Sequence, residues 1–377
     1  MNTSTLQTNL LDYFQWFHKN PELSYEEYRT TEKIRAILEA EAIEILPCAL
    51  DTGLAAIVRG KEPGPVQALR ADIDALPVEE KTGLPYSSCN PGKMHACGHD
   101  FHITAAIGSA IFLQHNRQSL RGTVKFLFQP AEESAVGALK ILETDVMKDV
   151  DRIWGFHVSS LFDTGVLGIS AGYVAAAVDK FLVTITGTGS HGARPHEGID
   201  PVPAACAIVQ ALQTIISRNI DAFHPAVISV TRIEAGKTWN VIPAEAELEG
   251  TVRTLDQKDR ALIEKRFREI TLQAAAAYGC TAQIQWESGS PAVKNDAEMA
   301  ALAARVGKAS GYDIVPEGKV MSGDDFSFYQ DICPGCYIRI GTGRGPAIHQ
   351  PCFQVDPDAL WPTVQYLTRL ITAAAVS

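Results

Sequence analysis

Residues 103–130 read ITAAIGSAIFLQHNRQSLRGTVKFLFQP. The first part, ITAAIGSAIFLQ (103–114), predicts a helix whose many small side chains allow neighbouring elements to approach closely. The second part, GTVKFLFQP (122–130), predicts a buried strand that ends at Pro130, with a helix after it. A helix followed by a buried strand and a further helix is typical of a layered α/β domain.

The segments on either side continue this alternation of helix and strand. Apolar residues recur at helical spacing over 4–18 and 24–41, and Ser24 with Glu27 predicts a capping box at the start of the second helix. Four further segments predict strands: GLAAIVRG (53–60), VQALRAD (66–72), DRIWGFHV (151–158) and GVLGIS (165–170). The first half therefore favours an α/β fold with a largely parallel sheet.

The middle of the chain has a different pattern. Asp200-Pro201 predicts a helix start, with Asp at the N-cap and Pro in the first turn, and this helix extends to about Ser217. Around it we expect four strands, at 180–189, 226–235, 245–254 and 281–288, and one more helix at 257–278. This is an α+β unit of about 110 residues, an ordinary domain size. Alternation then returns, with helices expected at 296–309, 324–330 and 357–374 and a strand at 336–340.

Length and composition indicate a globular protein of more than one domain. The chain has 377 residues, of which 46% are hydrophobic and 20% charged. That length exceeds one ordinary core, so we expect two domains. A net charge of −11 argues against nucleic-acid binding, which needs clustered Lys and Arg. We read no signal peptide and no membrane span, and we expect the eight cysteines to be free thiols in a cytoplasmic protein.

The stretch MHACGHDFH (94–102) gathers soft metal ligands just before the helix predicted at 103–114. Cys97 and His99 can face the same way only if the backbone turns, and Gly98 permits that turn. A structural zinc site normally pairs one C-x-x-C with another, and Cys333-Pro334-Gly335-Cys336 has no counterpart. The alternatives are one corner of a metal site, or a loop with a buried thiol and a capping imidazole.

Three more positions at strand ends carry groups that bind metals. Glu132 and Glu133 follow the strand of 122–130, where one could ligate a metal while the other acts as a base, although an acidic helix start is the plainer alternative. His157 ends an apolar strand, where a packed core histidine is the more common alternative. His349 follows the Gly-rich turn GTGRG (341–345). Together these residues could supply the ligands of two divalent ions.

Seven motifs, taken in order, resemble the amidohydrolase subfamily of the aminoacylase/carboxypeptidase-type dinuclear metallopeptidases, which includes hippurate hydrolases, N-acyl-amino-acid amidohydrolases and auxin-conjugate hydrolases. The resemblance spans about residues 10–370. The motifs are RADIDALP (70–77), MHACGHD (94–100), FQPAEE (128–133), HGARPHEGIDP (191–201), WNVIPAEAELEGTVRT (239–254), GDDFSFY (323–329) and His349.

The resemblance implies a two-domain fold. Residues 1–178 and 292–377 would form a catalytic α/β domain with a mixed, largely parallel sheet. Residues 179–291 would form an inserted α+β, ferredoxin-like domain that serves as lid and dimerisation domain. The implied activity is hydrolysis of the amide bond of N-acyl or N-aroyl amino acids, in a homodimer or a higher oligomer of dimers, without nucleic acid or membrane partners.

The resemblance also implies a role for each matching residue. Two divalent ions per subunit, Zn²⁺ or Mn²⁺, with Ni²⁺ or Co²⁺ as alternatives, would share Cys97 as a bridging thiolate. The remaining ligands would be His99, Glu133, His157 and His349. Glu132 would be the general base and acid, and Asp72 would hold a ligand or orient the site. Arg253 would bind the substrate carboxylate, and His191 and Asn240 would reach the partner subunit's site.

Other readings of the sequence are a serine hydrolase, a thiol redox protein, a metallocarboxypeptidase or dipeptidase on the same fold, and a non-catalytic binding protein. Gly168-Ile169-Ser170-Ala171-Gly172 matches G-x-S-x-G, but a second strand rather than a helix is expected after it. The CPGC of 333–336 lacks the neighbouring βαβ unit of a redox motif. An intact Glu132 beside a full ligand set argues against a protein that only binds.

Overall fold

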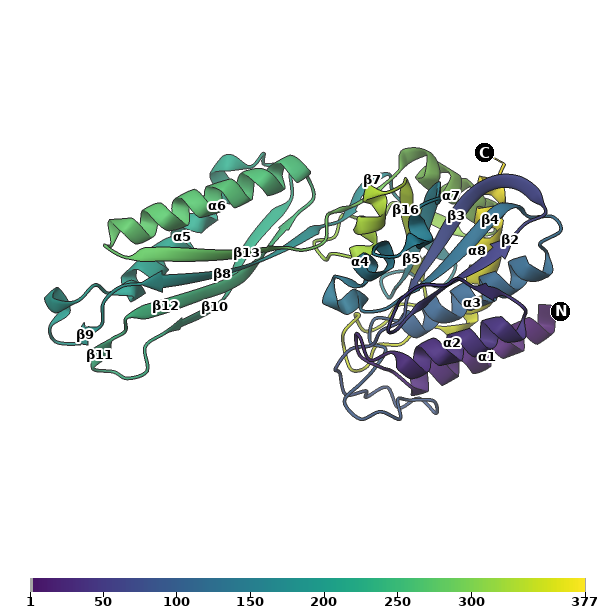
Figure 1. Cartoon of the computed structure of the whole chain (residues 1–377), viewed down its shortest axis with the longest axis horizontal. Coiled ribbons are helices and arrows are strands. Elements are labelled where there is room, and N and C mark those ends of the chain that lie inside the picture. The colour runs from purple at the N-terminus through teal and green to yellow at the C-terminus, as the bar shows by residue number, and fades with distance from the viewer. Residues whose placement is uncertain (1–2, 377) are drawn as a thin grey trace. The chain divides into compact units, whose positions relative to one another are not determined.

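The computed structural model describes residues 3–376, which form two compact units. Of the described residues, the first unit comprises 3–174, 294–318 and 325–376, and the second comprises 175–293 and 319–324. Figure 1 shows the helices and strands of both. Since the first unit is built from separated stretches of sequence, its core depends on contacts between residues far apart in the chain.

The first unit is built on an eight-stranded mixed sheet in the order β1-β2-β4-β3-β5-β16-β6-β15. Its centre, β4-β3-β5-β16, is parallel, whereas β1 and β2 on one side and β6 beside β16 run antiparallel to their neighbours. The strands are β1 (Glu44–Ile45), β2 (Leu54–Arg59), β3 (Glu62–Asp72), β4 (Arg121–Gln129), β5 (Arg152–Ser159), β6 (Val166–Gly168), β15 (Asp313–Val315) and β16 (Gly335–Gly341). Parallel central strands place their carboxyl ends along one edge of the sheet.

One helix of the first unit is buried along almost its whole length. Helix α3 is apolar around its circumference, as expected for a helix with neighbours on every side, and it packs against the sheet and against α1, α2 and α8. The helices of this unit are α1 (Thr3–Lys19), α2 (Tyr28–Ala40), α3 (His99–His115), α4 (Gly137–Leu142), α7 (Ala297–Ala309) and α8 (Leu360–Ala374), with short 3-10 helices at Glu132–Ser134, Asp145–Met147, Asp325–Asp331 and Pro357–Ala359.

The second unit has the chain order strand, helix, strand, strand, helix, strand. Its elements are β8 (Ala177–Thr186), α5 (Pro201–Asn219), β10 (Ala226–Ala235), β12 (Glu245–Thr254), α6 (Gln257–Ala277) and β13 (Thr281–Ser288). The antiparallel sheet has the order β10-β12-β8-β13, which is the ferredoxin-like arrangement. Figure 1 shows α5 and α6 running along this sheet, and their buried side chains join those of the strands in one core.

Four short strands complete the topology. β9 (Ser190–His191) pairs with β11 (Val241–Ile242), and β7 (Gly172–Ala175) pairs with β14 (Val293–Asn295). A further 3-10 helix covers Pro195–Glu197. The predicted N-cap of α5 is confirmed, because the Asp200 carboxylate accepts the Val202 N–H at 2.9 Å.

The capping box predicted for α2 is wrong. The helix begins at Tyr28, and its N-cap residue, Glu27, makes no capping hydrogen bond. Ser24 donates instead to Asp74, while Glu27 accepts from Thr52 and from the backbone of Ala131. Tertiary hydrogen bonds have taken the two side chains that the local pattern assigned to the helix start.

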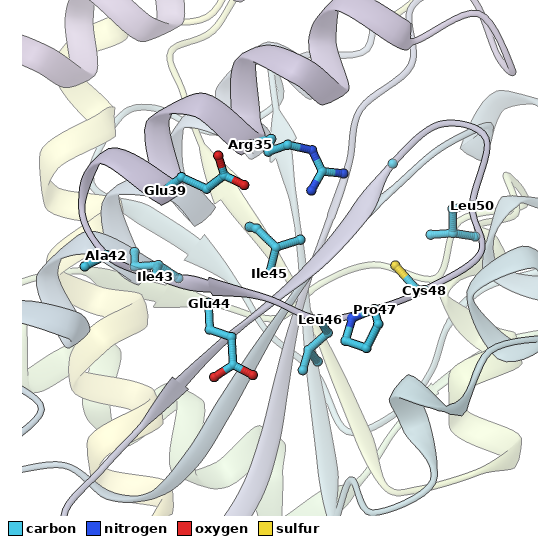
Figure 2. A pocket seen from close by; sticks show the side chains of 11 residues that line it. Arg35, Glu39, Ala42, Ile43, Glu44, Ile45, Leu46, Pro47, Cys48 and Leu50 are labelled. Carbon is cyan, nitrogen blue, oxygen red and sulfur yellow. The ribbon is translucent and has the colours of Figure 1, made fainter.

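A surface groove lies beside the edge strand β1 (Figure 2). It is lined by residues of α2 and of the segment that leads through β1 toward β2, namely Arg35, Glu39, Ala42, Ile43, Glu44, Ile45, Leu46, Pro47, Cys48, Leu50 and Gly53. No predicted site residue lines this groove. Within residues 3–376, no helix is long and apolar enough to cross a membrane.

Candidate functional site

The carboxyl ends of the central parallel strands bring five sequence motifs of the first unit together. Asp72 ends β3, the Glu132–Ser134 turn follows β4, and His157 lies near the end of β5. His349 lies in the loop after β16, where its backbone N–H donates to Ala96 O at 2.7 Å. That hydrogen bond places His349 beside the loop that carries Cys97, at the edge of the sheet where open α/β proteins bind ligands.

Gly98 supplies the turn expected between Cys97 and His99. Its φ is +83°, and a side chain there would lie 2.5 Å from a methyl group of Val158. His99 is therefore the first residue of α3, and Cys97 immediately precedes the turn. The thiol and the imidazole then converge, together with His157, on one buried point, because the ligand atoms of these three residues all lie within 4.8 Å of one another.

The hydrogen bonds of two histidines orient their remaining nitrogen toward that point. His99 Nδ1 lies 2.9 Å from Asp74 O, and His157 Nδ1 lies 2.7 Å from Val158 O. A carbonyl oxygen only accepts, so each ring carries a proton on Nδ1, and Nε2 is the nitrogen that faces the site. A backbone carbonyl that binds the far nitrogen of a histidine is the usual support of a metal ligand.

The two glutamates stand on a tight turn with an unusual backbone. Ala131 and Ala135, on either side of the Glu132–Ser134 helix, have φ values of +54° and +58°. The turn is closed by Ala135 N–H donating to Glu132 O at 2.7 Å. It directs Glu132 to within 3.9 Å of His99 Nε2 and Glu133 to within 3.6 Å of His349 Nε2.

Cys97 belongs to two groups of candidate ligands. One group is Cys97, His99 and His157, and the other is Cys97, Glu133 and His349, each with ligand atoms within 4.8 Å of one another. Two buried atoms in these groups, His99 Nε2 and Glu133 Oε1, lack a hydrogen-bond partner among the described residues. Buried polar atoms are rarely left unsatisfied, so the donor set fits two cations that share one thiolate.

The electrostatics of the site also call for a cation. Burial raises the pKa of the Cys97 thiol well above its ordinary value, and Glu133 raises it further. Burial likewise raises the pKa of Glu133. Burial lowers the pKa of His157 well below its ordinary value, with Arg339 acting in the same direction, so this imidazole is neutral. A neutral imidazole is the form that binds a metal, and a bound metal stabilises the thiolate that burial disfavours.

Asp72 lies behind the ligands within a buried charged network. Its carboxylate binds His102 Nδ1 on one side and Arg70 on the other. Arg70 reaches Asp325 at 2.7 Å and Gln129 at 3.0 Å. Although burial alone favours the protonated form, Arg70 holds the pKa of Asp72 well below its usual range. His102 Nε2 accepts the Val158 N–H at 3.0 Å, which ties this network to the strand that carries His157.

Asp74 also supports the site, and the sequence did not single it out. Its Oδ2 accepts the Ser24 hydroxyl at 2.7 Å and the Glu133 N–H at 3.0 Å, while its carbonyl binds His99. It sits two residues beyond Asp72, so the alternation of a strand would have pointed to it. By contrast, His95 is buried but belongs to none of the ligand groups found among the described residues. Burial lowers its pKa to about 4.

The three predicted substrate-binding residues all lie in the second unit. His191 and Asn240 are brought together by the pairing of β9 with β11 and by Gly192 N–H donating to Asn240 O at 2.8 Å. His191 Nδ1 accepts the Ala193 N–H at 3.0 Å, so its proton is on Nε2, which can act as a donor. Arg253, on β12, donates through Nε to the Thr251 hydroxyl at 3.1 Å.

The described residues do not support the serine-hydrolase or the thiol-redox alternative. Gly168 ends β6 and Gly172 begins β7, so Ser170 lies between two strands and not on the strand-to-helix turn of a serine hydrolase. Cys333 and Cys336 are both buried, and burial raises the pKa of both thiols. Such thiols are inert compared with those of redox motifs.

Known proteins resemble this chain in both sequence and fold. The model of the peptidase family M20/M25/M40 matches residues 68–373. N-acetylcysteine deacetylase from Bacillus subtilis (strain 168) is 43% identical, over 98% of each chain. IAA-amino acid hydrolase ILR1-like 2 from Arabidopsis thaliana is 35% identical, over 95% of this chain and 86% of its own. The crystal structure of the Bacillus subtilis YXEP protein, a dinuclear metal-binding peptidase of the M20 family, superposes with a TM-score of 0.90 at 40% identity and covers 99% of both chains.

The chain therefore belongs to the peptidase family M20/M25/M40. It is a metal-dependent hydrolase of the amidohydrolase branch, as the order of its motifs implied.

Proposed function

We propose that this chain hydrolyses the amide bond of N-acyl or N-aroyl amino acids, releasing a carboxylic acid and a free amino acid. The observation that carries the proposal is the placement of Cys97 in two ligand groups, with Glu132 beside them. Because one relative is an N-acetylcysteine deacetylase, N-acetyl-L-cysteine is the first substrate to test.

Two divalent ions would be held by the two groups, one by Cys97, His99 and His157 and the other by Cys97, Glu133 and His349. Thiolate and imidazole ligands suit Zn²⁺, and a site with a carboxylate also accepts Mn²⁺, Ni²⁺ or Co²⁺. When bound, such a pair of ions lowers the pKa of a water molecule and polarises the amide carbonyl.

The side chains of the protein account for the proton transfers. Glu132 is assigned as the general base, which takes a proton from the attacking water and returns it to the leaving amine. It lies 3.9 Å from His99 Nε2, and its side chain is 12% exposed, so water can reach it. Asp72 keeps its charge beside Arg70 and orients His102 behind the ligands.

The second unit is assigned to substrate binding. Arg253 would bind the substrate carboxylate through its planar guanidinium, whose geometry matches a carboxylate bidentately. His191 and Asn240 would donate hydrogen bonds to the scissile carbonyl in the partner subunit of a homodimer. In this proposal residues 1–178 and 292–377 are the catalytic domain, and 179–291 are the lid and dimerisation domain.

Hydrolysis assays on wild type and Glu132→Gln test this function. N-acetyl-L-cysteine, other N-acetyl amino acids, hippurate and dipeptides are incubated with protein loaded with Zn²⁺, Mn²⁺ or Co²⁺. We expect cleavage of the N-acyl amino acids and a loss of about 10²–10⁴-fold in kcat for the variant, the usual contribution of a general base. Equal rates in both proteins would refute the role of Glu132, and cleavage of dipeptides alone would make the chain a dipeptidase.

Mixing subunits tests the assignment in trans. A heterodimer of His191→Ala and Glu132→Gln subunits contains one site with both residues intact, so part of the activity should return. Verified heterodimers without activity would contradict the assignment of His191 to the partner's site.

A further inference from the structure

The turn that carries Glu132 and Glu133 needs support from outside itself. Alanine carries a Cβ and so disfavours the left-handed backbone region, yet Ala131 and Ala135 both lie in it. Gly137 packs tightly beneath the turn, since a side chain there would lie 1.7 Å from Pro130 O. Displacement of this turn would move the proposed base and a proposed metal ligand together.

Glu27 holds the first residue of that turn. Its Oε1 accepts the Ala131 N–H at 2.8 Å, and its other oxygen accepts the Thr52 hydroxyl at 2.8 Å. The Glu27 side chain is completely buried. Its backbone is fixed too, because Glu27 O accepts from the N–H of Thr31 at 2.9 Å and from its hydroxyl at 2.6 Å. The carboxyl group therefore links the start of α2, the loop before β2 and the turn after β4.

The same short segment supports the turn at a second point. Ser24 donates to Asp74 at 2.7 Å, and Asp74 in turn accepts the Glu133 N–H at 3.0 Å. Ser24 and Glu27 are the two residues that the capping-box pattern assigned to α2. Both side chains instead stabilise the backbone around the glutamates.

We propose that Glu27 is a positioning residue that fixes the backbone turn of Glu132 and Glu133. This inference rests on the proposed function, which gives those two glutamates their roles. What matters is the length of the side chain and its acceptor oxygen, because the group to be held is a neutral backbone N–H. Burial raises the pKa of Glu27 to about 7, which is consistent with a role that does not depend on its charge.

Two substitutions separate length from charge. Glu27→Gln keeps the length and one carbonyl oxygen for Ala131 N–H, so we expect kcat within about threefold of wild type. Glu27→Asp keeps the carboxylate but is one methylene too short. We expect kcat to fall about tenfold to a hundredfold with KM nearly unchanged, the scale set by displacing a catalytic group by about an ångström.

Glu22 and Thr52 provide matched controls. Glu22 lies in the same segment, and its carboxylate accepts the N–H groups of Arg29 at 3.2 Å and Thr30 at 2.8 Å. Glu22→Asp should therefore weaken the start of α2 and leave kcat unchanged. Thr52→Val removes only the second bond of Glu27, so it should lower the melting temperature without lowering kcat. A loss of kcat in either control as large as in Glu27→Asp would overturn the proposal and assign Glu27 a general structural role.

Titration with Co²⁺ gives a readout that does not depend on turnover. Glu133 stands on the turn, whereas Cys97, His99 and His157 do not. Glu27→Asp should therefore lower the affinity for one of the two Co²⁺ ions by about tenfold to a hundredfold and leave the affinity for the other unchanged. This is the usual effect of losing the group that supports a metal ligand. Glu27→Gln should bind both ions as wild type does.

The two measurements separate this proposal from the proposed function. Wild type that binds two Co²⁺ ions but cleaves no N-acyl amino acid would refute the proposed function, and the Co²⁺ titrations would still decide the role of Glu27. Equal Co²⁺ binding and equal kcat in Glu27→Asp and wild type would overturn the proposal. A Glu27→Gln variant that loses as much kcat and Co²⁺ affinity as Glu27→Asp would also overturn the proposal.

Discussion

His18 should make the stability of the first unit depend on pH in the alkaline range. Its Nδ1 lies 2.6 Å from Asp100 Oδ2, its Nε2 lies 3.1 Å from Glu80 Oε1, and its side chain is only 5% exposed. The ring of Tyr86 packs against it edge-on. A protonated imidazole donates to both carboxylates, whereas a neutral one can donate to only one of them.

The magnitude follows from the pKa of His18. Burial alone lowers this pKa, but the hydrogen bonds from His18 to Asp100 and Glu80 outweigh burial and raise it from 6.5 to about 9. A difference of one in pKa corresponds to about 1.4 kcal/mol, so the charged imidazole contributes about 3 kcal/mol. Because the folded-state pKa is the higher one, this stability is fully present below pH 6.5 and is lost as the pH rises through 9.

Equilibrium urea unfolding of wild type and His18→Gln at pH 6 and pH 10 measures this contribution. Glutamine keeps hydrogen-bonding atoms but carries no charge. We expect the difference in unfolding free energy between the two proteins to shrink by about 3 kcal/mol from pH 6 to pH 10. His224→Gln is the control, because His224 pairs with Asp259 at a site where the imidazole is 49% exposed, and exposed pairs contribute little. A difference for His18→Gln that is the same at both pH values would refute the reasoning.

Three further predictions concern other parts of the chain. Arg70→Met leaves Asp72 and Asp325 buried without their cation, so urea unfolding should show a loss of about 3–5 kcal/mol, whereas Arg344→Met, at an exposed pair with Asp163, should cost less than about 1 kcal/mol. Gly98→Ala brings a Cβ to 2.5 Å from Val158 and should lower both the melting temperature and kcat. Gly165 has a similar positive φ, but a Cβ there would meet nothing within 4 Å. Gly165→Ala should therefore lower the melting temperature less and leave kcat unchanged. Arg253→Ala should raise KM for N-acyl amino acids about tenfold or more without a matching rise for their amides, because a charged hydrogen bond contributes about 1.5–3 kcal/mol. An equal KM for acid and amide in wild type would contradict the role of Arg253 in binding the substrate carboxylate.

Much of the fold could be predicted from the sequence because local patterns and burial agree there. The buried strand at 122–130, the helix at 103–114 and the capped helix after Asp200 all appear at their expected places. The short strands β1, β7, β9, β11, β14 and β15 were not predicted, because two to four residues carry too little periodicity to be recognised. The resemblance of the motifs, and not periodicity, gave the ferredoxin-like arrangement of the second unit.

The support of the site was less predictable than its ligands. Cys97, His99 and the glutamate pair are reactive groups in short motifs, which a sequence displays directly. Arg70, Gln129 and Asp325 form one buried network only after β3, β4 and the 325–331 segment come together, and no local pattern shows this. Ser24 and Glu27 matched a helix cap, and tertiary hydrogen bonds of greater consequence replaced it.

We propose that two metal ions share one thiolate, that of Cys97. A crystal structure of the metal-loaded protein, with anomalous scattering measured at the absorption edge of the metal, tests it directly. With Zn²⁺ we predict two ions about 3.5–4 Å apart, each about 2.3 Å from Cys97 Sγ. A single ion, or two ions of which only one contacts Cys97 Sγ, would contradict the account.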